Sequence, residues 1–336
     1  MIWGIPLNRS AEMETKPRLF VSRWIPDEGQ NVLRPRFELS INLGDEALSK
    51  EELARAVVGK EALLGSVSDI VDKEVIAGGD RLRVIAIFGA GYDNIDVDFA
   101  TRRRVWVINL PDKLAEPTAD LTWALLLALA RQIVPANDLV KSGRWRGWDP
   151  RVFYGNNVFG KTLGVVGFGR IGQAVARRAL GFKMRTIYHD RVRKGGEVER
   201  QLSASYVPLD ELLVSSDFVS LNASLAAESH HLIGRRELEL MRPSAYLINT
   251  SRGAIVDERA LLETLKAHRI AGAALDVFEN EPHVDPGFFK VENVILTPHI
   301  GTAIVETRVE MATAIAEDIL LALKGKIPTG AVNYVL

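Results

Sequence analysis

The residues GVVGFGRIGQ, 164–173, are the most informative about the fold, because they place glycines at Gly167, Gly169 and Gly172. The apolar run TLGVV just before them predicts a buried strand, and the residues after them have helical spacing. In a dinucleotide-binding loop the first glycine permits a tight turn, the second lets the backbone approach a pyrophosphate, and the third lets helix and strand pack closely. Arg170 and Ile171 would open the helix, whose N-terminus offers N–H groups and partial positive charge to a phosphate.

A carboxylate follows at the distance that such a loop requires. Asp190 ends the run TIYHD, 18 residues after Gly172, where it can accept a hydrogen bond from a ribose hydroxyl. The charge of Asp190 favours NAD, because it would repel the 2′-phosphate of NADP. The basic residues that come next, Arg191, Arg193 and Lys194, could instead pair with that phosphate, so NADP stays an alternative.

Length and composition narrow the class of protein. A chain of 336 residues suggests roughly two domains. With 42 basic and 43 acidic residues, the net charge is -1, so we expect a small-molecule ligand and neither nucleic acid nor membrane as partner. The absence of cysteine excludes disulfides and thiolate chemistry. We predict no metal site, take the cytoplasm as the default compartment, and expect residues 1–17 to form a loose extension.

Two series of short apolar runs predict the domain organisation. The first series predicts strands at residues 18–25, 36–43, 62–66, 82–89 and 105–110, with a helix over 49–59. The second predicts strands at 162–167, 185–190, 218–223, 245–250, 272–278 and 294–299. Continuous apolar strands of this kind are typical of parallel sheets covered on both faces. We therefore predict an α/β protein with two Rossmann-like, doubly wound parallel-sheet domains and a cleft between them.

The helices suggest how the two domains are joined. Residues 116–143 are expected to form one long helix, and its apolar core, residues 121–130, is about half as long as a membrane span requires. Residues 303–324 carry a helical apolar stripe that ends at Gly325. We predict a flavodoxin-like, substrate-binding and catalytic domain of residues 1–111 plus 302–336, into which an NAD(P)-binding Rossmann domain, residues 112–301, is inserted.

Three residues suited to catalysis follow successive strands of the second series. Arg252 could hold an anionic substrate, Glu281 offers a carboxylate, and His299 offers an imidazole that can donate or accept a proton. Because ligands of parallel sheets bind at the carboxyl ends of the strands, we expect the three side chains to face one crevice. Among the six histidines, His299 alone combines a strand end with an acidic partner.

These motifs resemble the D-isomer-specific 2-hydroxyacid dehydrogenase family, and closely its glyoxylate and hydroxypyruvate reductase branch. The resemblance extends over nearly the whole chain after residue 18, through GAGYDNID, PTADLTWALLLAL, GFGRIG, LINTSRGAIVDE, LDVFENEP and TPHIGTA in the order of the family. It implies reduction of a small 2-keto acid with a nicotinamide cofactor, and a homodimer joined through the nucleotide-binding domains.

The resemblance also implies roles for individual residues. Arg252 would grip the substrate carboxylate, His299 would be the general acid and base, and Glu281 would hydrogen-bond the imidazole. Backbone N–H groups of Ala90 and Gly91 would hold the substrate carboxylate from its other side. Besides the glycine loop and Asp190, the residues implied to line the cofactor are Thr118, Arg170, Ile171, Ala223, Ser224, Thr250, Ser251, Arg252, Asp276, His299 and Gly301.

Two alternatives stay open at this point. Residues 142–155 also resemble the same segment of phosphite dehydrogenase, although that enzyme has a lysine where this chain has Ala90, and a phosphite dianion would lack its charge compensation. Transcriptional corepressors that retain this fold keep similar catalytic residues, so a non-catalytic, NAD-sensing binding protein is the second alternative.

Overall fold

The computed structural model describes residues 15–44 and 46–335. Most of the extension predicted for residues 1–17 lies outside them. The chain divides into two compact units, one of Met1–Phe88, Asn94–Asn109 and Met311–Leu336, the other of Gly89–Asp93 and Leu110–Glu310. We call them the first and the second unit.

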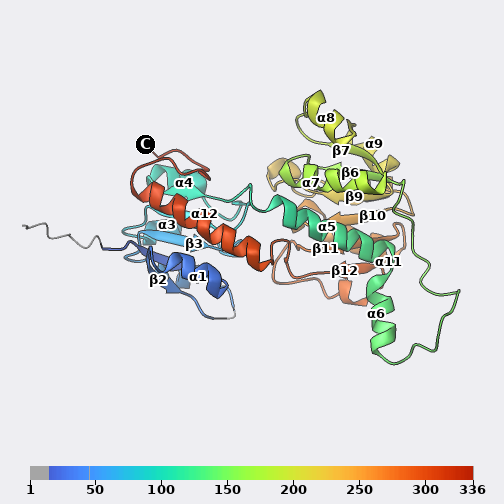
Figure 1. Ribbon diagram of the computed structural model, residues 1–336, viewed down its shortest axis with the longest axis horizontal. Coiled ribbons are helices and arrows are strands. Elements are labelled where there is room, and N and C mark those ends of the chain that lie inside the picture. The colour runs from blue at the N-terminus through green and yellow to red at the C-terminus, as the bar shows by residue number, and fades with distance from the viewer. Residues whose placement is uncertain (1–14, 45, 336) are drawn as a thin grey trace, which may run out of the picture. The chain divides into compact units, whose positions relative to one another are not determined.

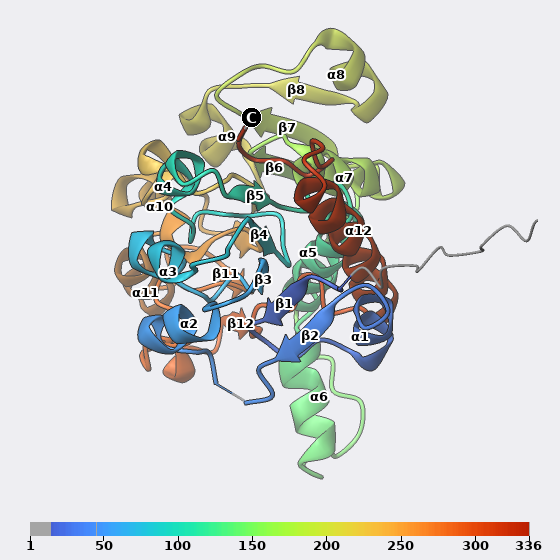
Figure 2. The ribbon, with the colours of Figure 1, turned by 90° about the vertical axis from the view of Figure 1, so that its left-hand side faces the viewer.

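The first unit is built on a parallel five-stranded sheet. Its strands are β1 (Arg18–Val21), β2 (Glu38–Ile41), β3 (Ala62–Gly65), β4 (Val84–Ile87) and β5 (Trp106–Ile108), in the order β2-β1-β3-β4-β5. This is the flavodoxin-like strand order, as predicted. Figure 2 shows α2 (Lys50–Ala56), α3 (Lys73–Gly78) and α4 (Val97–Arg102) on one face, and α1 (Asp27–Leu33) and α12 (Val305–Leu323) on the other.

The short helices of the first unit begin at polar caps. Ser49 and Glu52 form a reciprocal capping box at α2. The carboxylates of Asp72 and Asp96 accept N–H groups in the first turns of α3 and α4. Of these helices only α2 was predicted, because α3 and α4, with six residues each, are too short for a clear helical period.

The second unit is built on a parallel seven-stranded sheet. Its strands are β6 (Thr162–Val166), β7 (Arg185–His189), β8 (Ala204–Tyr206), β9 (Phe218–Leu221), β10 (Tyr246–Asn249), β11 (Gly272–Leu275) and β12 (Val294–Leu296), in the order β12-β11-β10-β9-β6-β7-β8. Because β7 and β8 lie on one side of β6 and β9 to β12 on the other, this is the Rossmann order extended by one strand. The fold class is therefore confirmed, although the short edge strand β8 was not predicted.

Helices cover both faces of the second sheet. The helices are α5 (Ala115–Ala130), α6 (Ile133–Lys141), α7 (Arg170–Ala179), α8 (Gly196–Leu202), α9 (Leu209–Ser215), α10 (Arg235–Leu240) and α11 (Glu258–Lys266), and the 3-10 turns are η1 (Leu180–Phe182), η2 (Ala227–Ser229), η3 (Gly253–Ile255) and η4 (Phe288–Lys290). Consecutive residues of β10 alternate between two cores: Tyr246 and Ile248 pack with α5 and α7, whereas Leu247 packs with α9 to α11. This alternation is why the strands are continuously apolar.

The long helix expected over residues 116–143 is wrong, because the structure has two helices there. Gln132 between α5 and α6 has left-handed backbone angles (φ 51°), and the two axes differ by 68°. Pro135 explains the break, since its ring would clash with the carbonyl of residue 131 in a continuous helix. Figure 1 shows α6 projecting from the body of the second unit, followed by a long excursion of the chain.

The last predicted helix is confirmed as α12, which Gly325 follows with φ 72°. Within the described residues no single helix is long and apolar enough to cross a membrane; the bent pair α5 and α6 reaches that length and composition only when the two are taken together.

Candidate functional site

The nucleotide site would lie where the strand order of the second sheet reverses, between β6 and β9. A cavity of about 310 Å³ opens there. Predicted cofactor residues that line it are Gly167, Gly169, Asp190, Ala223 and Ser224. Arg252, Glu281 and His299 are not among its lining residues.

The three glycines of the loop differ in what requires them. Gly167 has φ 86°, and a Cβ there would lie 2.6 Å from the backbone nitrogen of Ala223. A Cβ on Gly172 would lie 2.1 Å from the carbonyl oxygen of Gly167. At Gly169, by contrast, a Cβ would meet no protein atom within 4 Å. Gly169 therefore keeps space free at the N-terminus of α7, as the approach of a pyrophosphate requires.

Asp190 is fixed by the loop that it follows. Its Oδ2 accepts the N–H of Phe168 at 2.8 Å and faces the ammonium group of Lys194 at 3.1 Å. Burial by itself would raise the pKa of Asp190, but these partners and the N–H of Val192 overcome it, so the pKa is lowered. The carboxylate is thus held ionised beside the cavity.

The basic residues after Asp190 are largely engaged. Arg193 forms two hydrogen bonds with Glu199, and Lys194 pairs with Asp190. Arg191 is exposed and lines the cavity. Of these basic groups, Arg191 is therefore the one placed to meet a 2′-phosphate.

The remaining predicted cofactor residues fall into two groups. Arg170 and Ile171 open α7, and Arg170 pairs with Asp112.

The second group lies around Gly301. A Cβ on Gly301 would lie 3.5 Å from both Thr118 Oγ1 and Asp276 Oδ2, so these three residues lie together. Thr250 joins them through Thr122, whose hydroxyl lies 2.8 Å from that of Thr250 and also donates to the Thr118 carbonyl. Ser251 donates its hydroxyl to Asn249.

The structure brings His299 and Glu281 together. Nδ1 of His299 lies 2.8 Å from Oε2 of Glu281, which leaves Nε2 for another partner. The other carboxylate oxygen of Glu281 accepts the N–H of Phe278 at 2.9 Å. Burial would raise the pKa of Glu281, but His299, the Phe278 N–H and the charge of Arg252 lower it overall. Glu281 is thus a fixed carboxylate that can stabilise an imidazolium.

Asp276 holds the backbone of the loop that carries His299. Its buried carboxylate accepts the hydroxyl of Thr297 at 2.6 Å and the N–H groups of Ile300 and Gly301 at 2.9 and 3.0 Å. Its carbonyl accepts the N–H of His299 at 2.8 Å. His299 has a left-handed backbone (φ 54°), which is uncommon outside glycine and needs such support. Asp276 was expected to line a cofactor, and its contacts within the chain are those of a loop anchor.

Arg252 is aimed by a residue that the sequence reasoning missed. Its Nε donates to Oδ1 of Asp93 at 3.0 Å, and its Nη1 donates to the Ser251 carbonyl at 2.9 Å. A Cβ on Gly91 would lie 1.6 Å from Nη2 of Arg252, so this position must be glycine for the guanidinium to lie where it does. Ala90, the other residue expected to bind substrate, precedes Gly91 in the same loop. The GAGYDN motif contains Asp93, but spacing alone does not indicate a partner 159 residues away.

The chain is similar to known proteins over nearly its whole length. A family model described as "D-isomer specific 2-hydroxyacid dehydrogenase, NAD binding domain" matches residues 123–301. Glyoxylate reductase of Thermococcus litoralis is 47% identical over 322 residues, which are 95% of this chain and 97% of that relative.

Solved structures are also similar to this chain over nearly its whole length. The TT0316 protein from Thermus thermophilus is 40% identical with a TM-score of 0.87, covering 94% of this chain and 100% of that one. A glyoxylate reductase from Paecilomyes thermophila is 33% identical with a TM-score of 0.83, covering 95% of this chain and 99% of that one. These similarities favour neither the phosphite dehydrogenase nor the corepressor alternative.

Proposed function

Because the chain belongs to the D-isomer specific 2-hydroxyacid dehydrogenase family, we propose that it reduces glyoxylate or hydroxypyruvate, with Arg252, Glu281 and His299 as its catalytic residues. The chain is an oxidoreductase that acts on a CH–OH group with NAD. Glyoxylate as substrate is supported by the names of the relatives from Thermococcus litoralis and Paecilomyes thermophila. The observation that carries the catalytic assignment is the His299 to Glu281 hydrogen bond of 2.8 Å.

The domain assignment belongs to the same proposal. We propose that residues 112–301 bind the cofactor and that residues 1–111 with 302–336 form the substrate-binding and catalytic domain. The open space at Gly169, the N-terminus of α7 and the ionised Asp190 fit a dinucleotide. The loop residues would hold the pyrophosphate, and Asp190 would accept a ribose hydroxyl. When bound in its reduced form, NAD supplies the hydride.

The other steps fall to side chains of this chain. Arg252, whose charge is aimed by Asp93, would bind the carboxylate of the keto acid and orient its carbonyl group. His299 would donate a proton from Nε2 to the carbonyl oxygen, since its Nδ1 faces Glu281. Glu281 would stabilise the imidazolium before the transfer and fix the ring orientation throughout.

Replacement of His299 tests the assignment. His299→Gln should lower turnover of glyoxylate by roughly 10²- to 10⁴-fold, because general acid catalysis contributes about that factor. NADH binding, measured by fluorescence titration, should survive. His268→Gln, which changes an exposed histidine outside the site, is the matched control and should keep full turnover. Near-normal turnover of His299→Gln would refute the proton-transfer role.

The substrate and the coenzyme are tested by one panel of assays. Glyoxylate, hydroxypyruvate and larger 2-keto acids are each offered with NADH and with NADPH, and phosphite is offered with NAD in the oxidative direction. We expect the highest kcat/KM with a small keto acid and NADH, because Asp190 would repel the 2′-phosphate of NADPH. Failure of every keto acid would refute the proposed substrate class.

We also propose that the chain forms a homodimer through the second unit. No residue of α6 is buried, although Ile133, Val134 and Val140 lie on it. The excursion that follows exposes 86% of Trp148 and 75% of Tyr154. Exposed aromatic and aliphatic groups on one projecting segment are typical of an interface, and a second copy of the chain would cover them. We call residues 133–154 the projecting segment.

A further inference from the structure

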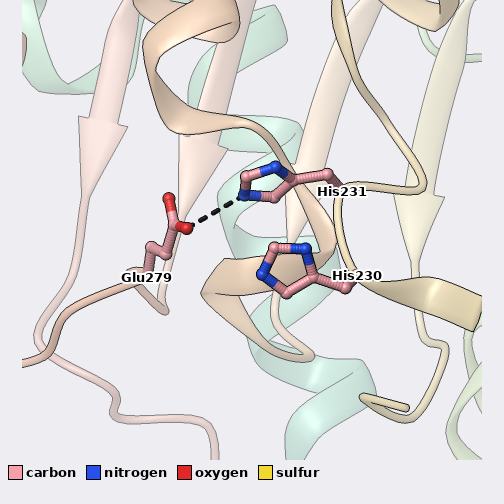
Figure 3. Close-up of side chains that lie close together, drawn as sticks. All are labelled: His230, His231 and Glu279. Carbon is pink, nitrogen blue, oxygen red and sulfur yellow. Dashed lines mark hydrogen bonds and ion pairs between the residues drawn. The ribbon is translucent and has the colours of Figure 1, made fainter. Parts of the chain in front are cut away.

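A cluster of two imidazoles and a carboxylate lies apart from the proposed catalytic pair. It consists of His230, His231 and Glu279, shown in Figure 3. One ligand atom from each residue can be chosen so that all three atoms lie within 4.8 Å of one another. His231 Nε2 lies 2.9 Å from Glu279 Oε1, and the two imidazole rings are tilted by 32° with centroids 4.0 Å apart.

The backbone fixes two of these residues. His231 has a left-handed backbone (φ 51°), and its N–H donates to the Ala254 carbonyl at 2.8 Å. The N–H of Glu279 donates to Glu258 at 2.6 Å. His230 is exposed, and in the described part of the chain its ring contacts that of His231 and has no hydrogen-bond partner. Its imidazole can therefore turn toward Glu279 without breaking a hydrogen bond.

A further carboxylate supports the cluster from within the fold. Glu258 is buried, and the hydrogen bond that it accepts from the N–H of Glu279 fixes the backbone of one proposed ligand. A hydrogen-bonded His231 and Glu279 pair alone would not need a second imidazole beside it.

We propose that His230, His231 and Glu279 bind a divalent transition metal ion, with Zn²⁺ the best match. Two imidazoles and one carboxylate are a known zinc ligand set, whereas Mg²⁺ and Ca²⁺ prefer oxygen ligands alone. Zinc bonds of roughly 2.0–2.2 Å would draw the three ligand atoms together, which the exposed ring of His230 can follow. Water would complete the coordination. This site is independent of the function proposed above.

A metal ion here would link the neighbourhood of the loop that carries Arg252 to the loop that carries Glu281. His231 is hydrogen-bonded to Ala254, which follows Arg252 by two residues, and Glu279 precedes Glu281 by two residues. Gly253 already packs against the peptide between Phe278 and Glu279, where a Cβ would lie 1.9 Å from the Phe278 carbonyl carbon. The ion would therefore stabilise the loops that position the catalytic groups without contacting the substrate.

Metal binding is measured on the untagged full chain after treatment with a chelator. Zn²⁺ alone is added in equilibrium dialysis, and bound metal is determined by elemental analysis. We expect one Zn²⁺ per chain, bound more weakly at lower pH because protons compete for the imidazoles. His230→Gln should lose more affinity than the roughly 10- to 100-fold typical of an outer-shell partner, and its fold should survive because the residue is exposed.

Two further variants separate this site from others. His268→Gln, which alters a histidine outside the cluster, should bind Zn²⁺ as the unaltered chain does, and so should His299→Gln. Zn²⁺ should also raise the thermal unfolding midpoint of the unaltered chain and not that of His230→Gln. Absence of stoichiometric binding, binding that His230→Gln leaves unchanged, or binding that His299→Gln abolishes would each overturn the proposal.

Discussion

At the scale of single residues, the site depends on what its glycines leave free. Gly91 leaves room for the Arg252 guanidinium, while Gly169 leaves room at the N-terminus of α7. Both positions were selected from the sequence as places of close approach. The structure adds that the space at Gly91 is filled by the Arg252 side chain, whereas no protein atom fills the space at Gly169.

Gly91→Ala should impair catalysis more than folding. The new Cβ would collide with the far end of Arg252, which can move without disturbing a core, so the guanidinium would shift while the fold persists. Because a misplacement of about 1 Å can cost about 10²-fold, we expect a fall of that order in kcat/KM. Gly181→Ala is the matched control, since a Cβ there meets no atom within 4 Å. Equal kcat/KM in the two variants would show that the position of Arg252 does not limit the reaction.

The loss of folded-state stability at acid pH should depend in part on Glu281. The ordinary glutamate pKa is 4.5, and that of Glu281 is lowered in the folded chain. A carboxyl group with a lowered pKa stabilises the fold above its unfolded pKa, and this stability is lost as the pH falls through the folded pKa. Urea midpoints should therefore drop from about pH 5 to about pH 3 less steeply in Glu281→Gln than in the unaltered chain. Parallel slopes would show that Glu281 contributes nothing to this loss.

At the scale of helices and strands, the predictions succeeded where the pattern was long. The apolar strands of the second unit and α12 were found because each has a clear period or a continuous apolar run. The edge strand β8 has three residues, and α3 and α4 have six each, so their periods are too short to detect. The break between α5 and α6 was missed because the apolar pattern continues through it, although Pro135 was a visible signal.

In the candidate site, residues at strand ends were predicted, whereas their partners in loops were not. His299 and Glu281 were paired from strand ends, since the carboxyl ends of parallel strands share one edge of the sheet. Asp93 and Glu279 were missed because each meets its partner through loops that no periodicity describes. The buried Asp276 was selected by resemblance, but its hold on the His299 loop became visible only from its hydrogen bonds.

Gly164→Ala should destabilise the contact between β6 and α9. A Cβ at Gly164 would lie 2.2 Å from Ser216 Oγ and 2.6 Å from Leu212 Cδ2, both in fully buried residues. Overpacking of a core costs about 1–3 kcal/mol, so the free energy of unfolding should fall by that amount in denaturant titration. Gly181→Ala again serves as control and should stay within about 0.5 kcal/mol. If the free energy of unfolding of Gly164→Ala equalled that of Gly181→Ala, strand β6 would have to shift more easily than its close packing indicates.

At the scale of the whole molecule, the projecting segment predicts how stability depends on concentration. If a second copy covers residues 133–154, dilution should lower the thermal midpoint, because association stabilises only the folded chain. Sedimentation velocity should give twice the mass of one chain at high concentration. Trp148→Asp should shift the distribution toward single chains, since it places a charge on an exposed apolar surface.

Leu43→Asp is the matched control for that experiment. Leu43 is also an exposed apolar residue, 74% accessible, but it lies in the first unit, outside the projecting segment. Its variant should sediment as the unaltered chain does. A single-chain mass for the unaltered protein at every concentration would refute the homodimer.

The contacts of His299 have a consequence for how this site can diverge between relatives. The carboxylate of Glu281 bonds the ring. Asp276 instead holds the backbone, because its carbonyl accepts the N–H of His299 and its carboxylate accepts those of Ile300 and Gly301. The direction of the imidazole ring and the path of the backbone that carries it are thus held by different residues. A lineage could re-aim the ring by altering Glu281 alone, and the loop beneath it would be inherited intact.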